Sequence, residues 1–160
     1  MKLDKVIFLD VDGVLNSTYS MMINKKEGEL FVDLPYAEHV AILNNITDRT
    51  NSPIVISSTW RIGEHLHSLR RLFYLAGVKG SIIGMTPVHK GEHTLRGNEI
   101  TEWLQTNAPS LLITRRFVIL DDDSDMADLM DNLIQTDFHT GLRIEHSYRA
   151  IAILNGGLIK

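Results

Sequence analysis

The feature that most constrains this chain is an uninterrupted apolar run at residues 6–9, followed directly by Asp10-Val11-Asp12-Gly13. Because no polar residue alternates with the apolar ones, the run predicts a strand that is buried on both faces. Such strands occur in parallel sheets with helices packed on both sides. The pattern therefore predicts an α/β fold. It also places two carboxylates at the carboxyl end of a strand, where ligands bind in sheets of this kind.

The rest of the chain alternates between short apolar segments and longer helix-like ones. Further strands are predicted over 54–56, 81–83, 117–120 and 133–135, and helices over 35–45, 60–75, 96–104 and 147–154. Residues 16–34 contain few core candidates, and we interpret them as an excursion from the sheet, folded as a hairpin around Gly28. Alternation of strands and helices, without a repeat or a linker, predicts a single domain over residues 1–160.

Composition narrows the class of protein further. The 160 residues include no cysteine, which excludes disulfides and thiolate metal sites. No apolar run approaches the roughly 20 residues that cross a bilayer, so we expect no membrane partner and a cytoplasmic location. The net charge of −4 argues against a generic nucleic-acid-binding surface, but residues 60–116 alone carry +4. That basic middle third is either an ordinary solvated surface or a face for an anionic substrate.

Polar side chains follow three of the predicted strands. They are Asp10 and Asp12 after the first strand, Ser57, Ser58 and Thr59 after the second, and Asp121, Asp122 and Asp123 after the strand at 117–120. Because the carboxyl ends of parallel strands share one edge of the sheet, these groups should converge. Carboxylates gathered there would repel one another unless a cation lay between them, and hard oxygen ligands suit Mg²⁺.

Each group has a simpler interpretation when it is taken alone. Asp-x-Asp-Gly can be a tight turn; it also resembles the start of a calcium loop, but that loop follows a helix and has a later Glu. The aspartates at 121–123 can cap a helix, as can Ser57 and Thr59. Four histidines lie in two elements without a metal-ligand spacing, which favours surface positions over a zinc site: His65, His67, His89 and His93. The joint occurrence at three strand ends favours a catalytic site.

These segments resemble the motifs of the haloacid dehalogenase (HAD) superfamily. The first motif is similar to Ile-Phe-Leu-Asp-Val-Asp-Gly-Val-Leu at 7–15, the second to Ile-Val-Ile-Ser at 54–57, and the fourth to Val-Ile-Leu-Asp-Asp at 118–122. The third motif, a basic residue that opens a helix, is best matched by Arg96, with Lys90 in reserve. The segments at 57–61, 96–100 and 120–126 more closely resemble the branch found in RNA-repair proteins and polynucleotide 3′-phosphatases.

The resemblance implies a fold and a mechanism. The fold would be the three-layer, Rossmann-like HAD fold with a central parallel sheet and no cap domain, only a small flap. Asp10 would attack phosphorus and form an aspartyl-phosphate, and Asp12 would protonate the leaving oxygen and then deprotonate the hydrolytic water. Ser57 would hydrogen-bond a phosphoryl oxygen, and Arg96 would offset negative charge. The implied Mg²⁺ ligands are Asp10, Asp12 through its backbone carbonyl, Asp122 and Asp121, and the expected substrate contacts are Ser58, Thr59, Arg61 and Lys90.

The expected substrate is a phosphomonoester, and the closer resemblance favours 3′-phosphate ends of nucleic acid. The segments between the motifs are too short for a folded cap, and an open site admits a polymer end. Basic side chains of the middle third, with Lys25 and Lys26 on the flap, could follow a phosphate backbone: Arg61, Arg70, Arg71, Lys79, Lys90 and Arg96. The alternatives are a phosphatase for small metabolites such as mononucleotides, and a non-catalytic regulatory domain. Retention of the motif aspartates argues against the non-catalytic domain.

Overall fold

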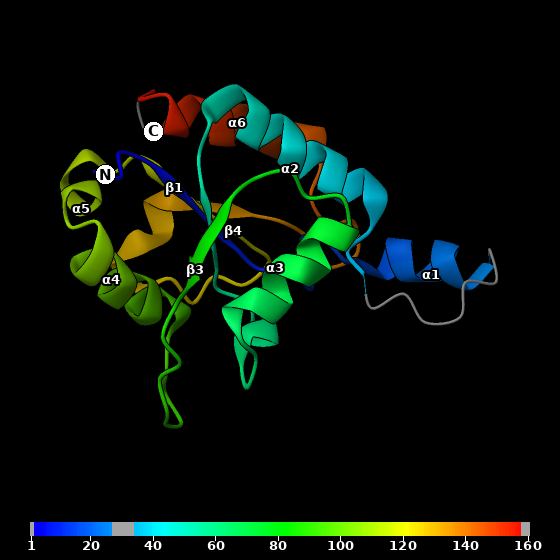
Figure 1. Ribbon diagram of the computed structural model, residues 1–160, viewed down its shortest axis with the longest axis horizontal. Helices are drawn as coiled ribbons and strands as arrows, with labels where there is room; N and C mark the ends of the chain where they lie inside the picture. The colour runs from blue at the N-terminus through cyan, green and yellow to red at the C-terminus, as the bar shows by residue number, and fades with distance from the viewer. Residues whose placement is uncertain (1, 27–33, 158–160) are drawn as a thin grey trace.

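The computed structural model describes residues 2–26 and 34–157, apart from the side chains of Lys25 and Lys26. It contains a five-stranded sheet in the order β3-β2-β1-β4-β5, in which all neighbouring strands are parallel (Figure 1). The strands are β1 (Val6–Leu9), β2 (Ile54–Ile56), β3 (Ile82–Met85), β4 (Phe117–Asp121) and β5 (Leu133–Gln135). The predicted Rossmann-like α/β architecture is confirmed.

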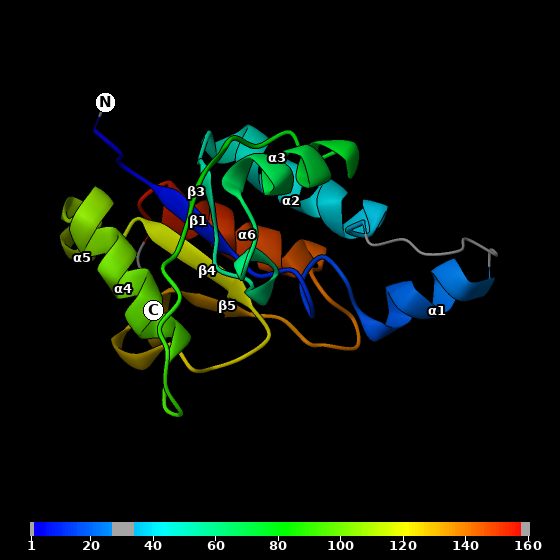
Figure 2. The ribbon, with the colours of Figure 1, turned by 60° about the horizontal axis from the view of Figure 1, so that its bottom comes forward.

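Helices cover both faces of the sheet (Figure 2). One face packs against α2 (Ala37–Thr50), α3 (Leu66–Leu75) and α6 (Ile144–Leu154), and the other against α4 (Arg96–Asn107), α5 (Ser110–Thr114) and the 3-10 helix η2 (Ala127–Asn132). Along β1, Ile7 and Leu9 join the first core while Val6 and Phe8 join the second. All four are fully buried. Because side chains alternate along a strand, an unbroken apolar run fits only where both faces are covered.

The helices differ from prediction more than the strands do. β1, β2 and β5 have the predicted bounds, whereas β3 is displaced and extended to 82–85 and β4 extends by one residue, to Asp121. The helix predicted over 60–75 is interrupted, because Gly63 takes a positive φ of 76° between the 3-10 helix η1 (Thr59–Arg61) and α3. Residues 18–26 form the helix α1 (Thr18–Lys26) instead of a hairpin strand, and Gly28 lies outside the described residues. Within the described part, no helix is long and apolar enough to cross a membrane.

The strand order also fixes where the residues after the strands meet. β1 lies between β2 and β4: the chain continues from β1 to β2 and β3 on one side, and then crosses to β4 and β5 on the other side. The backbone N–H of Asp10 donates to the Leu120 carbonyl, and that of Ser57 donates to the Leu9 carbonyl, both at 3.0 Å. The residues after β1, β2 and β4 therefore start side by side, at the point in the topology where open α/β sheets bind their ligands.

Candidate active site

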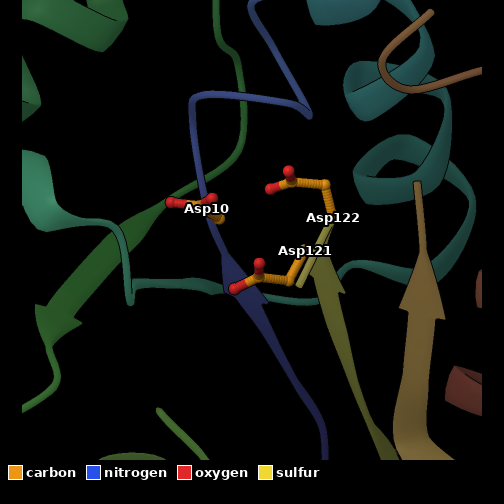
Figure 3. A group of neighbouring side chains, drawn as sticks. All are labelled: Asp10, Asp121 and Asp122. Atoms are coloured by element: carbon orange, nitrogen blue, oxygen red, sulfur yellow. The ribbon is translucent and has the colours of Figure 1, made fainter. Parts of the chain in front are cut away.

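Three carboxylates meet at the carboxyl edge of the sheet (Figure 3). Asp10 follows β1, Asp121 is the last residue of β4, and Asp122 is the next residue along the chain. One carboxylate oxygen from each lies within 4.8 Å of the other two. The convergence predicted from the strand ends is therefore present for these three residues.

Burial makes this cluster electrostatically costly. Asp10 is 6% exposed and Asp121 is fully buried. Burial raises the pKa of Asp10, and the nearby Arg96 opposes that rise. Burial, and then the charge of Asp10, raise the pKa of Asp121 to about 8. Burial also raises the pKa of Asp122. Each shift has desolvation as its largest cause, since a carboxylate loses its hydration inside the protein.

The donor set fits a hard divalent cation. The Oδ2 atom of Asp121 is buried and, among the described residues, has no hydrogen-bond partner. Carboxylate oxygens are the ligands that Mg²⁺ prefers, and one or two of them suffice beside water and phosphate oxygens. A cation held by Asp10, Asp121 and Asp122 would offset their mutual repulsion. The Asp12 carboxylate is not in this group, so its expected contribution is the backbone carbonyl.

Asp12 is held by a partner that sequence reasoning did not identify. The indole N–H of Trp60, in η1, donates to the Asp12 Oδ2 at 2.8 Å. Trp60 lies in the segment at 57–61 that carries the family resemblance, but nothing local to the sequence pairs it with a residue 48 positions earlier. The turn after Asp12 depends on Gly13, which has a φ of +81°. A Cβ at Gly13 would lie 2.4 Å from the Asp122 carboxyl carbon, so the two acidic motifs pack directly on each other.

The segment after β2 supplies polar groups at the same edge. Ser57 is fully buried, and its hydroxyl has no hydrogen-bond partner among the described residues. A buried hydroxyl without a partner is a candidate donor to a substrate oxygen. The Ser58 hydroxyl lowers the pKa of Asp10 by hydrogen bonding, against the larger effect of burial, and it also accepts the Trp60 backbone N–H. Thr59 is exposed.

Arg96, rather than Lys90, lies among the carboxylates. Its Nη1 is 3.7 Å from the Asp10 Oδ1, and its Nε is 3.9 Å from the Asp121 Oδ2. The same Nη1 also donates to the Ser57 carbonyl. Lys90 is exposed, in the segment between β3 and α4.

The acidic segment after β4 also holds the first turn of α4. The Asp125 carboxylate accepts the Arg96 backbone N–H at 3.1 Å, so Asp125 caps the helix from another segment. The Asp123 side chain is exposed, and its backbone N–H donates to the Asp121 Oδ1 at 3.0 Å. Neither Asp123 nor Asp125 belongs to the cluster of three carboxylates.

Arg61, which we expected to contact the substrate, is buried inside the fold. It is 5% exposed and forms an ion pair with the buried Glu99, at 2.6 Å. Its other donors bond backbone carbonyls of Ser57, Ser58, Thr86 and Pro87. All of its N–H groups are thus used inside the fold, which leaves none for the substrate contact that we expected. Arg61 instead ties the segment after β2 to α4 and to the segment after β3.

The histidines do not form a zinc site in the described part of the chain. His65, His67 and His93 are exposed, and His89 Nε2 lies 2.6 Å from the Glu102 Oε2. The group of three aspartates is the cluster whose ligand atoms approach closely enough to share an ion. These positions agree with the prediction of surface histidines.

Comparison with known proteins identifies the family. The model of one family, described as the HAD domain in Swiss Army Knife RNA repair proteins, matches residues 6–147. No curated protein and no solved structure matches the chain. The matched region includes all the strands and the carboxylate cluster, and extends into α6. The chain therefore belongs to the family of HAD domains found in Swiss Army Knife RNA repair proteins.

Proposed function

We propose that this HAD-type hydrolase cleaves phosphomonoesters, with Asp10 as the nucleophile and Asp12 as the general acid and base. The observation that carries the proposal is the grouping of Asp10, Asp121 and Asp122 within 4.8 Å at the carboxyl edge of the sheet, with Arg96 beside two of them. Burying carboxylates costs folding free energy, and groups of buried carboxylates are therefore found mainly at functional sites. Family membership supports the proposal at the coarser level of a HAD-type hydrolase.

In the first step, an Asp10 carboxylate oxygen attacks phosphorus while the bond from phosphorus to the leaving oxygen breaks. Asp12 donates its proton to that oxygen, so the alcohol leaves neutral. In the second step, Asp12 removes a proton from water, the water oxygen attacks phosphorus, and the bond to Asp10 breaks. The products are one alcohol and one phosphate for each phosphomonoester and water, and Asp10 returns to its starting state.

The remaining groups stabilise charge on the phosphoryl oxygens. The Ser57 hydroxyl is free to donate to one of them, and Arg96 is close enough to Asp10 to offset the charge of the nucleophile and the phosphoryl group. Mg²⁺ held by Asp10, Asp121, Asp122 and the Asp12 carbonyl would supply the further positive charge that phosphoryl transfer needs. The N–H of Trp60 keeps the Asp12 carboxylate in one orientation.

The substrate class that we propose is a 3′-phosphate end of nucleic acid, because the family is described by RNA repair. In the structure, fewer of the basic side chains of residues 60–116 are available to a phosphate backbone than the sequence suggested. Arg61 is buried in an ion pair, and Lys79 lines a hollow with Asp4 and Pro53, before the amino ends of β1 and β2. Arg71 and Lys90 are exposed and remain available to a phosphate backbone.

The test compares the purified protein with Asp10→Asn and with a matched control, Asp123→Asn, which changes an exposed aspartate. Each is assayed with acetyl phosphate, a 3′-phosphorylated oligonucleotide and the matching 3′-mononucleotide, with Mg²⁺ and with EDTA. Asp10→Asn should abolish Mg²⁺-dependent release of phosphate, and Asp123→Asn should retain it. Full activity of Asp10→Asn would refute the mechanism, and an inactive wild type would favour a non-catalytic domain.

The same assay separates polymer from small-molecule substrates. A polymer substrate predicts higher kcat/KM on the oligonucleotide than on the mononucleotide, and an advantage that shrinks as salt rises, because phosphate contacts are screened. Equal efficiency on the two substrates at low salt would instead favour the small-metabolite alternative.

A further inference from the structure

A cavity lies next to the catalytic edge and is not used by the mechanism above. It has a volume of about 330 Å³ and is lined by Trp60, Glu64, Ser68, Leu69 and Leu72. These residues come from η1, the following loop and α3. Its size is at the lower end of the range of small-molecule sites, roughly 300–1,000 Å³.

One side chain joins this cavity to the chemistry. Trp60 lines the cavity and also donates its indole N–H to the Asp12 carboxylate at 2.8 Å. Asp12 must lie within hydrogen-bond reach of the leaving oxygen to protonate it. The group attached to that oxygen therefore starts beside Asp12, and Trp60, which contacts Asp12, forms one wall of the cavity.

The lining determines what kind of leaving group fits. Trp60, Leu69 and Leu72 give the cavity aromatic and aliphatic walls, and Ser68 and Glu64 add a hydroxyl and a carboxylate that can pair with hydroxyl and amino groups. In the described part of the chain, this lining includes no lysine or arginine. A second phosphate is therefore disfavoured there, whereas a neutral ring system with polar edges is favoured.

We propose that this cavity binds the nucleoside of a nucleoside phosphomonoester as the leaving group, with its base against Trp60. The inference rests on the proposed function and deepens it, since it names the chemistry on the leaving side of phosphorus. The nucleoside is either the terminal unit of a nucleic acid or a free mononucleotide. Bases stack on aromatic side chains with little dependence on sequence.

A cavity-filling variant tests the proposal by kinetics. Ser68 is exposed at the cavity rim on α3, so Ser68→Phe should fill the cavity without disturbing the core. His67→Phe, at the exposed neighbouring position outside the lining, is the matched control. Ser68→Phe should raise KM for a 3′-mononucleotide about tenfold, the effect of losing one base–aromatic stack. Turnover of acetyl phosphate, which has no nucleoside, should change by less than about twofold, and His67→Phe should leave both substrates unaffected.

A binding measurement tests the cavity without catalysis. The chain has two tryptophans, Trp60 and Trp103, so its ¹H–¹⁵N spectrum should show two indole N–H signals. Adenosine should shift the Trp60 signal in a saturable way, and ribose should not. Trp103 packs in the other core, against Phe8, and serves as the internal control. In Ser68→Phe the adenosine-dependent shift should be lost.

The outcomes separate this inference from the proposed function. No turnover of acetyl phosphate or nucleotide by the wild type refutes the proposed function, and a saturable adenosine shift of Trp60 would still support the cavity. Normal turnover together with an unchanged nucleotide KM in Ser68→Phe refutes the cavity while the proposed function stands. An equal loss on acetyl phosphate and nucleotide, or equal adenosine shifts of both indoles, also overturns it. Comparing kcat/KM for a 3′-phosphorylated oligonucleotide with that for the mononucleotide then shows whether the cavity prefers the terminal nucleoside of a nucleic acid or a free mononucleotide.

Discussion

Replacing Asp121 with asparagine should stabilise the metal-free protein at neutral pH, although it removes a residue of the candidate active site. Burial and the charge of Asp10 raise the pKa of Asp121 from its ordinary value of 3.8 to about 8. A carboxyl group whose pKa is raised in the folded state contributes its stability fully below the unfolded pKa, and the contribution is lost as the pH rises through the folded pKa. The wild type should therefore lose stability between about pH 4 and pH 8. Asparagine has nearly the same shape and does not ionise.

The size of the effect follows from the same shift. At pH 7 the unfolded chain has released the Asp121 proton while most of the folded protein retains it, which costs at most about 4 kcal/mol, at roughly 1.4 kcal/mol for each pH unit above 3.8. Asparagine can still accept the Asp123 backbone N–H, now 3.0 Å from the Oδ1. The charge of Arg96, whose Nε is 3.9 Å from the Asp121 Oδ2, already limits the pKa of Asp121 to about 8, so its loss adds no separate cost. Asp121→Asn should therefore be more stable by about 2–4 kcal/mol at pH 7.

Urea unfolding in EDTA at several pH values measures this difference. The gain should be small near pH 4.5 and should grow toward about pH 7.5, where it corresponds to a rise in Tm of roughly 5–10 °C for a chain of this size. Asp123→Asn, the same substitution at an exposed position, should change stability by less than about 0.5 kcal/mol. Mg²⁺ should narrow the gap, because a cation that binds the carboxylates stabilises the wild type more.

The result that would refute this reasoning is a variant less stable than the wild type at all these pH values in EDTA. Asp121 would then contribute more by its contact with Arg96 and its hydrogen bond than it costs by burial. A gain that does not depend on pH would also count against ionisation as its origin, since it would indicate a change in packing.

Three further predictions concern the groups around the carboxylates. Arg96→Ala should lower kcat by about 10²–10³-fold and Lys90→Ala by less than about twofold, measured with acetyl phosphate; the opposite pattern would make Lys90 the basic catalytic residue. Gly97→Ala should lower the free energy of unfolding by more than about 2 kcal/mol, because its Cβ would lie 2.1 Å from a backbone oxygen of the segment after β4; unchanged urea unfolding would contradict this packing. Trp60→Phe should lower kcat about tenfold on glycerol 3-phosphate, whose alkoxide leaving oxygen needs the Asp12 proton, through loss of the hydrogen bond to the Asp12 carboxylate, and wild-type kcat would show that this bond does not position Asp12.

The carboxylate cluster could be predicted because the positions of its residues follow from the arrangement of the strands. An unbroken apolar run requires the middle of a sheet, and parallel strands bring their carboxyl ends to one edge. Asp10 and Asp121 each continue such a run, so their convergence needs no knowledge of side-chain packing. Helix bounds were harder to predict. α2 extends to Thr50, where the hydroxyl bonds the Ile46 carbonyl and Asn51 closes the helix in the left-handed conformation.

Contacts between distant side chains could not be predicted from local patterns. Arg61 has the appearance of a substrate-binding residue in the sequence, but its role depends on a buried Glu99 on another element. His39 is a second case: it is buried, its Nδ1 lies 2.8 Å from the Leu142 carbonyl and its Nε2 lies 3.1 Å from the Ser17 hydroxyl. Burial lowers the pKa of His39. Periodicity indicates which face a residue occupies and says nothing about its partner across the fold.

The spacing of the motifs has a physical basis in the segment that follows β4. A Cβ at Gly13 would collide with the side chain of Asp122, and a Cβ at Gly97 would collide with the backbone of Met126. The first acidic motif and the first turn of α4 therefore both pack against this one segment at distances that leave no room for a Cβ. Each of them has a glycine at the point of contact. Asp125, in the same segment, caps the helix that presents Arg96. A shift of the segment would move Asp121, Asp122 and Arg96 together, so Gly13, Gly97 and Asp125 position the site although they are outside the carboxylate cluster.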